Sequence, residues 1–316
     1  MDYGYALSSE EHGPNELVEN ARKAEETGFT FALISDHFHP WTDAQASSPF
    51  VWSVIGAIAQ ATERLRLGTG VTCPTIGIHP AIVAHAAATA AAMMPGRFFL
   101  GVGTGENLNE HVVGARWPAP DERLEMLEEA IEVMRLLWQG GERTHRGKHY
   151  TVENARLYTL PDQPVELAVA GAKPKAAELA GRRGDGYVNT SPERELVQRF
   201  EQAGGQGKPR YGGIACCWAK SEDEGAEIVH RIWPNAALSG DLGYELPRPR
   251  HFEQATENVT PDDLKQVLPV GPDPERYVEQ VREYEHAGFT HVYFHQIGRD
   301  QEGFFRFWQK ELEPRL

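Results

Sequence analysis

Short apolar runs alternate with amphipathic stretches along the first hundred residues of the chain. The apolar runs predict buried strands, and stretches whose apolar residues recur every three or four positions predict helices. We expect strands at 3–7, 31–34, 65–72 and 97–102, and helices at 15–27, 50–62 and 81–94. Because strands and helices repeat at regular spacing, the pattern favours a parallel sheet closed into a (β/α)8 barrel of TIM type.

The alternation continues towards the C-terminus at longer intervals. Two segments, around 104–160 and 233–272, interrupt it and are expected to be insertions, and the second of them is long and proline-rich. Nothing in the sequence marks a domain boundary, so we expect one domain over residues 1–316. The later helices are expected at 122–138, 222–232 and 273–287, strands at 165–170, 186–189, 211–218 and 291–295, extended structure at 150–160, and a closing segment at 304–312.

Composition narrows the class of protein. The hydrophobic content of 41% is ample for a large core, and the net charge of −15 argues against partners such as nucleic acid or an anionic membrane surface. The longest apolar stretch, 80–94, is alanine-rich and too short to span a bilayer. The N-terminus has neither a basic start nor an apolar signal core, so we expect no export.

The three cysteines are Cys73, Cys216 and Cys217, and they cannot form a disulfide framework. A reducing compartment, and therefore the cytoplasm, fits this usage. Neither a CxxC nor an HExxH pattern occurs, so no metal site is predicted.

A polar cluster at 35–41 directly follows the strand expected at 31–34. The carboxyl ends of parallel strands are where chemistry is placed in α/β proteins, because the following loops project there from a rigid base. His37 can act as a general base near neutral pH. Asp36 can orient a ring or accept a hydrogen bond from a ligand. The alternative is that these polar groups only cap the next helix.

Further clusters follow other strands. In 103–110 the glycines allow close backbone approach to a ligand that Glu106 and Asn109 can reach, although the third glycine of a dinucleotide fingerprint is missing. The alternative is a glycine-rich turn. In 170–175, small residues and two lysines at the start of a helix suit a phosphate. The alternative is an ordinary turn with solvated lysines.

Five motifs together resemble the luciferase-like superfamily, and within it they are most similar to F420-dependent glucose-6-phosphate dehydrogenases and their alcohol-oxidising relatives. The resemblance covers nearly the whole chain. It implies a TIM barrel with insertions, coenzyme F420 bound at the carboxyl end of the strands, and usually a homodimer. FMN enzymes of the superfamily share the fold but generally lack the first and third motifs. The motifs are SDHFHPW at 35–41, LGTGVTCPT at 67–75, GVGTGENLNE at 101–110, GRRGDG at 181–186 and LEPRL at 312–316.

The resemblance implies four residues at the reacting centre. His37 matches the base that takes the hydroxyl proton while hydride leaves the same carbon for C5 of the deazaflavin, and the match selects it over His39. Glu106 matches an acid near N1 of the ring, Trp41 an indole that lines the site, and Glu10 a carboxylate of the substrate site.

Other positions match coenzyme contacts. Gly70–Val71 matches a non-prolyl cis peptide behind the ring, and 172–174 matches the turn whose backbone donors hold the coenzyme phosphate. The family usually has glycine where Lys173 stands. The coenzyme contacts implied are Asp36, Gly70, Val71, Thr104, Asn109, Ala172, Lys173 and Pro174.

The substrate is the open question at this level. Where the glucose-6-phosphate enzymes carry basic residues for the phosphate, this chain has 190–193 without a lysine, and Gly243 and Val267 in the second insertion. Arg231, Arg248, Arg250 and Lys265 lie nearby as candidate replacements, with a solvated surface role as the alternative for each.

The sequence therefore predicts an F420-dependent oxidoreductase that transfers hydride between the deazaflavin and a hydroxyl-bearing carbon of an alcohol, sugar or sugar phosphate. The expected partner is this small-molecule substrate. Three alternatives stay open: a glucose-6-phosphate dehydrogenase proper, an FMN-dependent luciferase-like monooxygenase, and a non-catalytic protein that only binds or carries the coenzyme.

Overall fold

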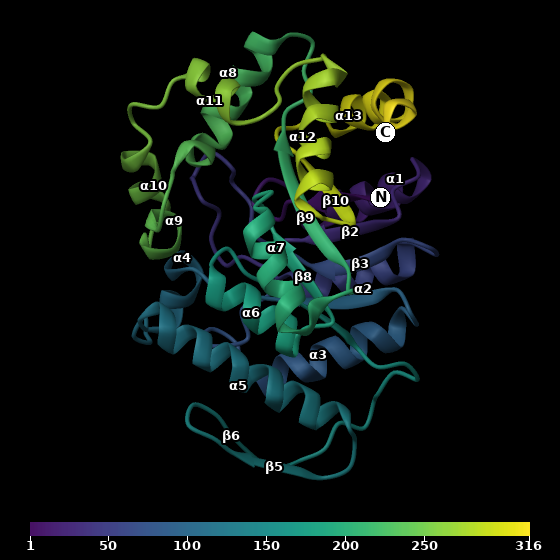
Figure 1. Cartoon of the computed structure of the whole chain (residues 1–316), viewed down its shortest axis with the longest axis vertical. Coiled ribbons are helices and arrows are strands. Elements are labelled where there is room, and N and C mark those ends of the chain that lie inside the picture. The colour runs from purple at the N-terminus through teal and green to yellow at the C-terminus, as the bar shows by residue number, and fades with distance from the viewer.

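Eight parallel strands close into a barrel in the computed structural model, which describes residues 1–316 (Figure 1). Around the barrel the strand order is β1-β10-β9-β8-β7-β4-β3-β2, and each strand pairs in parallel with both neighbours. The predicted TIM barrel is confirmed. The strands are β1 (Asp2–Leu7), β2 (Phe31–Ile34), β3 (Arg66–Thr69), β4 (Phe98–Val102), β7 (Glu166–Ala170), β8 (Gly186–Asn189), β9 (Arg210–Cys216) and β10 (His291–Gln296).

Helices form the outer layer of the barrel, because each presents one apolar face to the strands. In the first of them, for example, Leu17, Ala21 and Ala24 are buried. The longer helices are α1 (Pro14–Glu26), α2 (Val51–Ala61), α3 (Pro80–Met93), α5 (Pro120–Trp138), α6 (Pro174–Arg183), α8 (Glu222–Ile232) and α12 (Pro274–Ala287). The shorter α7 (Arg194–Phe200) was not predicted, because seven residues are too few for helical periodicity to stand out.

The first insertion holds the short α4 (Asn107–Glu110) and a two-stranded hairpin outside the barrel. Only the second strand of that hairpin, β6 (Thr151–Ala155), lies in the extended segment expected at 150–160. Its partner β5 (Arg143–Arg146) consists of charged and polar residues, so no apolar pattern marks it.

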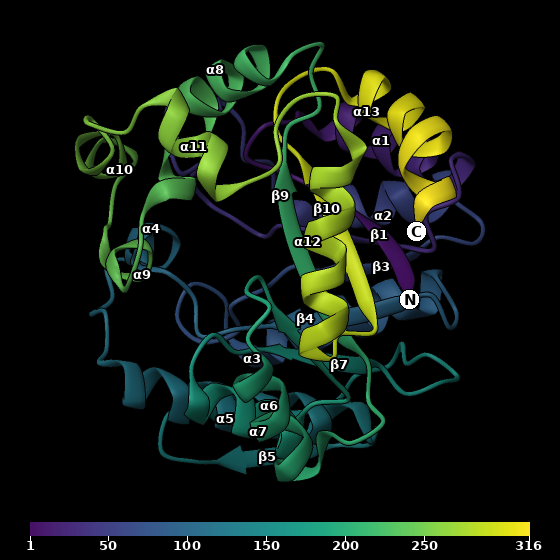
Figure 2. The same cartoon turned by 45° about the horizontal axis from the view of Figure 1, so that its top comes forward.

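The second insertion is built from short helical pieces that lie over one end of the barrel (Figure 2). Three of them begin at a proline, which suits the first turn of a helix because its missing N–H would be unpaired there anyway. Three of the six prolines of this segment therefore start helical pieces. The pieces are a 3₁₀ turn at Pro234–Ala237, α9 (Leu242–Glu245), α10 (Pro249–Ala255) and α11 (Pro261–Val267), and the chain later closes with α13 (Gln301–Phe307) and a π turn at Trp308–Leu312.

Aromatic rings fill the interior of the barrel. Phe99 and Tyr211 stack with their ring centroids 5.1 Å apart. Gly68 makes room for this packing, since a Cβ there would lie 2.3 Å from the ring of Phe99. The interior of the barrel is thus a packed core, and a ligand can bind only at the end of the barrel. No helix of the chain is both long and apolar enough to cross a bilayer.

Candidate active site

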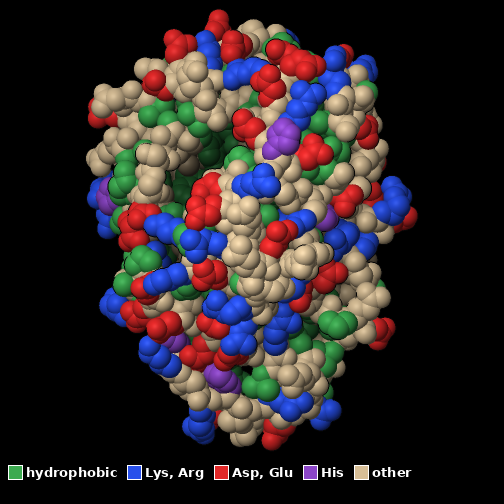
Figure 3. Space-filling model, in the orientation of Figure 1, with side chains coloured by type: hydrophobic (Ala, Val, Ile, Leu, Met, Phe, Trp, Pro, Cys, Tyr) green, Lys and Arg blue, Asp and Glu red, His purple; other side chains and the backbone are tan.

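A cavity of about 610 Å³ opens at the carboxyl ends of the barrel strands. Leu33 and Tyr293 from the barrel interior lie at its floor, and Trp233 and Phe252 from the second insertion lie in its wall. Figure 3 shows the hollow, with hydrophobic side chains along its inner surface. Active sites of (β/α)8 barrels are built at this end.

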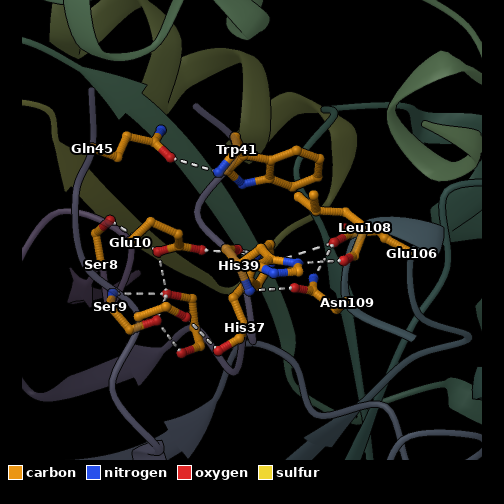
Figure 4. A network of polar contacts seen from close by, with 12 residues as sticks. Ser8, Ser9, Glu10, His37, His39, Trp41, Gln45, Glu106, Leu108 and Asn109 are labelled. Carbon is orange, nitrogen blue, oxygen red and sulfur yellow. Dashed lines mark hydrogen bonds and ion pairs between the residues drawn. The ribbon is translucent and has the colours of Figure 1, made fainter. Parts of the chain in front are cut away.

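His37 is the polar centre of the cavity (Figure 4). Its Nδ1 lies 3.4 Å from Glu10 Oε1, and its Nε2 lies 3.3 Å from Glu106 Oε2. The three residues follow β2, β1 and β4, whose carboxyl ends meet at one rim of the barrel. Glu10 and Glu106, which are 96 positions apart, therefore place one carboxylate on each side of the imidazole of His37.

The three groups shift one another's pKa values. Burial opposes the charged form of His37, but Glu10 and Glu106 outweigh it, so the pKa of His37 is raised. Burial by itself would raise the pKa of Glu10. The charge of His37 and a hydrogen bond from Ser35 outweigh burial and lower the pKa. Burial raises the pKa of Glu106, with Glu10 adding to the rise and His37 opposing it. The site thus holds one carboxyl biased towards ionisation and one biased towards protonation.

Two serines that the sequence reading did not single out hold Glu10 in place. Ser35 Oγ donates to Glu10 Oε2 at 2.6 Å, and Ser8 Oγ donates to the same oxygen at 3.0 Å. Glu10 is 2% exposed. Because both serines bind Oε2, the other oxygen is left facing His37. The sequence could have indicated Ser8 and Ser35 by their position, because they directly follow β1 and β2.

Trp41 lines the cavity beside the imidazole, and its role as the indole of the site stays a prediction. Its ring centroid lies 5.1 Å from that of His37 and 5.1 Å from that of Phe252 in α10. Its backbone N–H donates to Gln45 Oε1 at 2.7 Å. The second insertion therefore supports the indole from behind, a contact for which the aperiodic sequence carried no signal.

Asn109 joins two of the predicted clusters rather than standing free in the cavity. Its Oδ1 accepts from the backbone N–H groups of Phe38 at 3.0 Å and His39 at 3.1 Å. Its Nδ2 donates to Glu106 Oε2 at 3.2 Å. The ring of His39 is turned to the carbonyl of Leu108, at 3.0 Å, and does not line the cavity. Of the two histidines in the motif, the fold thus places only His37 at the centre.

Asp36 and Thr104 lie beside the cavity and do not line it. Asp36 Oδ2 accepts from Thr72 Oγ1 at 2.7 Å, and burial raises the pKa of Asp36. Thr104 is partly exposed between two glycines of the 103–110 cluster. Their predicted contacts with a coenzyme stay predictions.

The Gly70–Val71 peptide bond is cis, as the resemblance implied, and Gly70 lines the cavity. The loop after β4 packs tightly against it, since a Cβ on Gly103 would lie 2.8 Å from Val71 Cγ2. The backbone of Thr72 bonds to Gly101 and Gly103 at 2.9 and 3.0 Å. These contacts join the loops after β3 and β4 into one shelf beside the cavity.

Lys173 occupies the N-cap position of α6, with Ala172 before it and Pro174 as the first helical residue. The first turn of a helix leaves its backbone N–H groups without partners inside the helix. The side chain of Lys173 forms an ion pair with Asp241 of the second insertion, and Lys175 Nζ lies 2.8 Å from Asp121 Oδ1. Both lysines therefore have acidic partners at the surface, while the backbone donors remain free.

None of the four candidate cations for a substrate phosphate lines the cavity. Lys265 pairs with Asp223 at 2.6 Å and Asp262 at 2.8 Å on the outside of the insertion. The remaining three, Arg231, Arg248 and Arg250, are exposed. The alternative of a solvated surface role fits all four.

Comparisons with known proteins agree with this geometry. The sequence profile of the family described as luciferase-like monooxygenase matches residues 1–291. The chain belongs to the luciferase-like family. A relative from Microbacterium testaceum, named F420-dependent glucose-6-phosphate dehydrogenase, is 35% identical over 328 residues, which cover 100% of this chain and 97% of that protein.

Two solved structures share the architecture. An F420-dependent secondary alcohol dehydrogenase in complex with an F420–acetone adduct superposes with a TM-score of 0.91 at 30% identity, covering 99% of this chain and 98% of that one. The F420-dependent tetrahydromethanopterin reductase of Methanopyrus kandleri superposes with a TM-score of 0.77 at 20% identity, covering 99% of each chain, and shows the fold alone.

Proposed function

We propose that this luciferase-like protein is an oxidoreductase that uses coenzyme F420 to interconvert a hydroxyl-bearing carbon and a carbonyl. The observation that carries the proposal is His37, held between Glu10 and Glu106 at the centre of the cavity. The full-length relatives support it, because one is named as an F420-dependent sugar-phosphate dehydrogenase and another as an F420-dependent alcohol dehydrogenase. Their shared coenzyme agrees with the prediction from the sequence.

The cavity suits the planar ring of the coenzyme, and the start of α6, outside the cavity, suits its phosphate. A planar ring can lie against the shelf of Gly70 and Val71, because Gly103 in the neighbouring loop has no side chain to occupy that space. The free backbone donors at the start of α6 suit the coenzyme phosphate. When bound, F420 supplies the hydride acceptor. The residues that would hold it are Asp36, Gly70, Val71, Thr104, Asn109, Ala172, Lys173 and Pro174.

His37 serves as the base in this proposal. In its neutral form it takes the proton of the substrate hydroxyl, and Glu10 stabilises the imidazolium that results. Glu106, whose pKa is raised by burial, would hold the proton that the coenzyme takes up after the hydride. The 3.3 Å between His37 Nε2 and Glu106 Oε2 then lets the proton gained by His37 replace the one that Glu106 gives up. Trp41 closes the site against water.

The cavity favours an uncharged substrate over glucose 6-phosphate. Its lining residues include Glu10 and Glu106 but no lysine or arginine. A phosphate group there would lie close to carboxylates without a cation to balance it, and like charges in contact are unfavourable. We therefore infer an alcohol or uncharged sugar as the substrate.

Titration of the purified protein with F420 and with FMN tests the coenzyme. Bleaching of the F420 absorbance on adding alcohols, uncharged sugars or sugar phosphates then tests the reaction. We expect F420 to bind, and alcohols or uncharged sugars to bleach it. Micromolar binding of FMN without F420 would favour the monooxygenase alternative, and bleaching by glucose 6-phosphate alone would favour that dehydrogenase. F420 binding with no bleaching by any substrate would favour the carrier alternative.

We also propose a homodimer of the single domain predicted over residues 1–316. An apolar hollow between α2 and α3 is bordered by Phe50, Ile82 and Met93, whose side chains are strongly exposed. A second copy of the chain would cover this face. Light scattering of the wild type and of Ile82→Glu tests the homodimer, since a charge in the interface should separate it into monomers.

A cytoplasmic location is our further proposal, supported by three cysteines that form no disulfide.

A further inference from the structure

Glu10 and Glu11 are adjacent in the chain but bind different histidines. Glu10 faces His37, whereas Glu11 Oε1 lies 2.9 Å from Nε2 of His295. Glu11 is 3% exposed, and its other oxygen accepts the backbone N–H of Gly298 at 2.7 Å. The chain therefore places a second carboxylate–imidazole pair beside the one assigned to proton transfer.

His295 occupies the last inward-facing position of β10. Side chains alternate along a strand, so residues 291, 293 and 295 share the face that points into the barrel. Tyr293 belongs to the packed interior and to the cavity floor, and His295 lies one layer above it as a cavity-lining residue. Glu10 and His37 line the same cavity, so His295 lies in the same chamber as the reacting centre.

The orientation of the His295 ring is determined on two sides. Glu11 binds Nε2, and the indole of Trp233 meets the ring edge-on with centroids 4.6 Å apart. No hydrogen bond within the chain uses Nδ1, and Nδ1 is not among the fully buried atoms that lack a partner. In the neutral ring, a carboxylate on Nε2 favours the tautomer in which Nε2 carries the proton, and Nδ1 is then an acceptor open to the cavity.

We propose that His295 is a substrate-positioning residue whose Nδ1 accepts a hydrogen bond from a second hydroxyl group, so that the substrate is an uncharged compound with several hydroxyls. The proposal rests on the proposed function, because it assumes that the first hydroxyl is the one oxidised at His37. Glu11 holds the ring in the orientation that this contact needs. A site built to bind a hydroxyl discriminates against the analogue that lacks it.

Matched pairs of alcohols test the proposal in the F420-loaded enzyme. Each pair shares its carbon skeleton and its secondary carbinol: propane-1,2-diol with propan-2-ol, butane-1,3-diol with butan-2-ol, and pentane-1,4-diol with pentan-2-ol. We expect at least one diol to have a kcat/KM about tenfold or more above its partner. In His295→Phe this preference should vanish, because the diol should lose more of its kcat/KM than the mono-alcohol does. His295→Asn, which keeps an acceptor near the position of Nδ1, should recover part of it.

The control variant is His291→Phe, the same substitution on the same inward face of β10 but outside the cavity. It should leave the diol preference unchanged. Equal kcat/KM within each pair in the wild type, or equal losses for diol and mono-alcohol in His295→Phe, would overturn the proposal.

A binding measurement separates this proposal from the proposed function, because it needs no turnover. In ¹⁵N-histidine-labelled enzyme, the Nδ1 signal of His295 is assigned by its absence from His295→Phe. It should shift on titration with the diols and not with the mono-alcohols. A shift without F420 reduction would support the hydroxyl site and count against the dehydrogenase. F420 reduction by mono-alcohols without any shift by diols would support the dehydrogenase and overturn the hydroxyl site.

Discussion

His37 Nε2 lies 3.3 Å from Glu106 Oε2, and this pair joins the base of the site to a carboxyl whose pKa is raised by burial. The two side chains come from loops after β2 and β4, so the pair exists only when these strands lie on either side of β3. Its consequence is that a proton can be accepted, held and given up within one cavity. Four predictions test the residues that make this arrangement work.

Replacing His37 by alanine should lower turnover by roughly two to four orders of magnitude, the usual span for a lost general base. The affinity for F420 should change little, because His37 contacts the two carboxylates and not the shelf. Single-turnover reduction of F420 measures the loss. His39→Ala is the matched control and should cost far less, since the His39 ring faces the carbonyl of Leu108. A larger loss in His39→Ala would show that the base is the other histidine.

The rate of alcohol oxidation should rise with pH, because only neutral His37 can accept a proton. The pKa of His37 is raised in the fold, so the midpoint of this rise should lie above about 6.5, the ordinary value for histidine. In Glu10→Gln one of the two charges that favour the imidazolium is removed, and the midpoint should move to lower pH. Single-turnover rates across pH give both midpoints. A midpoint that stays in place or rises in Glu10→Gln would contradict the ion pair.

Lys173→Glu should weaken F420 binding about tenfold or more, because it brings a negative charge to the helix N-terminus proposed to hold a phosphate. At saturating F420, kcat should stay near the wild-type value, since Lys173 lies outside the reacting centre. Fluorescence titration with F420 gives the affinity. Lys310→Glu makes the same charge change at an exposed site in the C-terminal segment and should have no effect. Equal affinities in both variants would place the phosphate elsewhere.

Gly103→Ala should also weaken F420 binding, but through shape rather than charge. The added Cβ would lie 2.8 Å from Val71 Cγ2, so the shelf under the ring must shift. Gly243→Ala adds the same methyl group at another glycine near the cavity, where nothing lies within 4 Å of the new Cβ, and it should bind normally. Circular dichroism confirms that both variants fold. Normal coenzyme binding by Gly103→Ala would show that the ring does not rest on this shelf.

Much of the barrel is predictable from local pattern. The strands β2 and β8 were expected at their observed positions, because short apolar runs bounded by polar residues and glycine have few other interpretations. The helix α7 and the strand β5 were missed for the opposite reason. Seven residues make only two turns, and a charged surface hairpin has no buried face to impose alternation.

The motifs of the sequence determined which residue types carry the chemistry, because Glu10, His37 and Glu106 each follow a strand whose end reaches the same rim. Only the tertiary structure decided how they meet. It turned His37 towards two carboxylates and His39 away from the cavity, although both lie in one short loop. It also paired Glu11 with His295 across 284 positions of sequence. No local pattern encodes such a contact, because it depends on the closure that brings β1 beside β10.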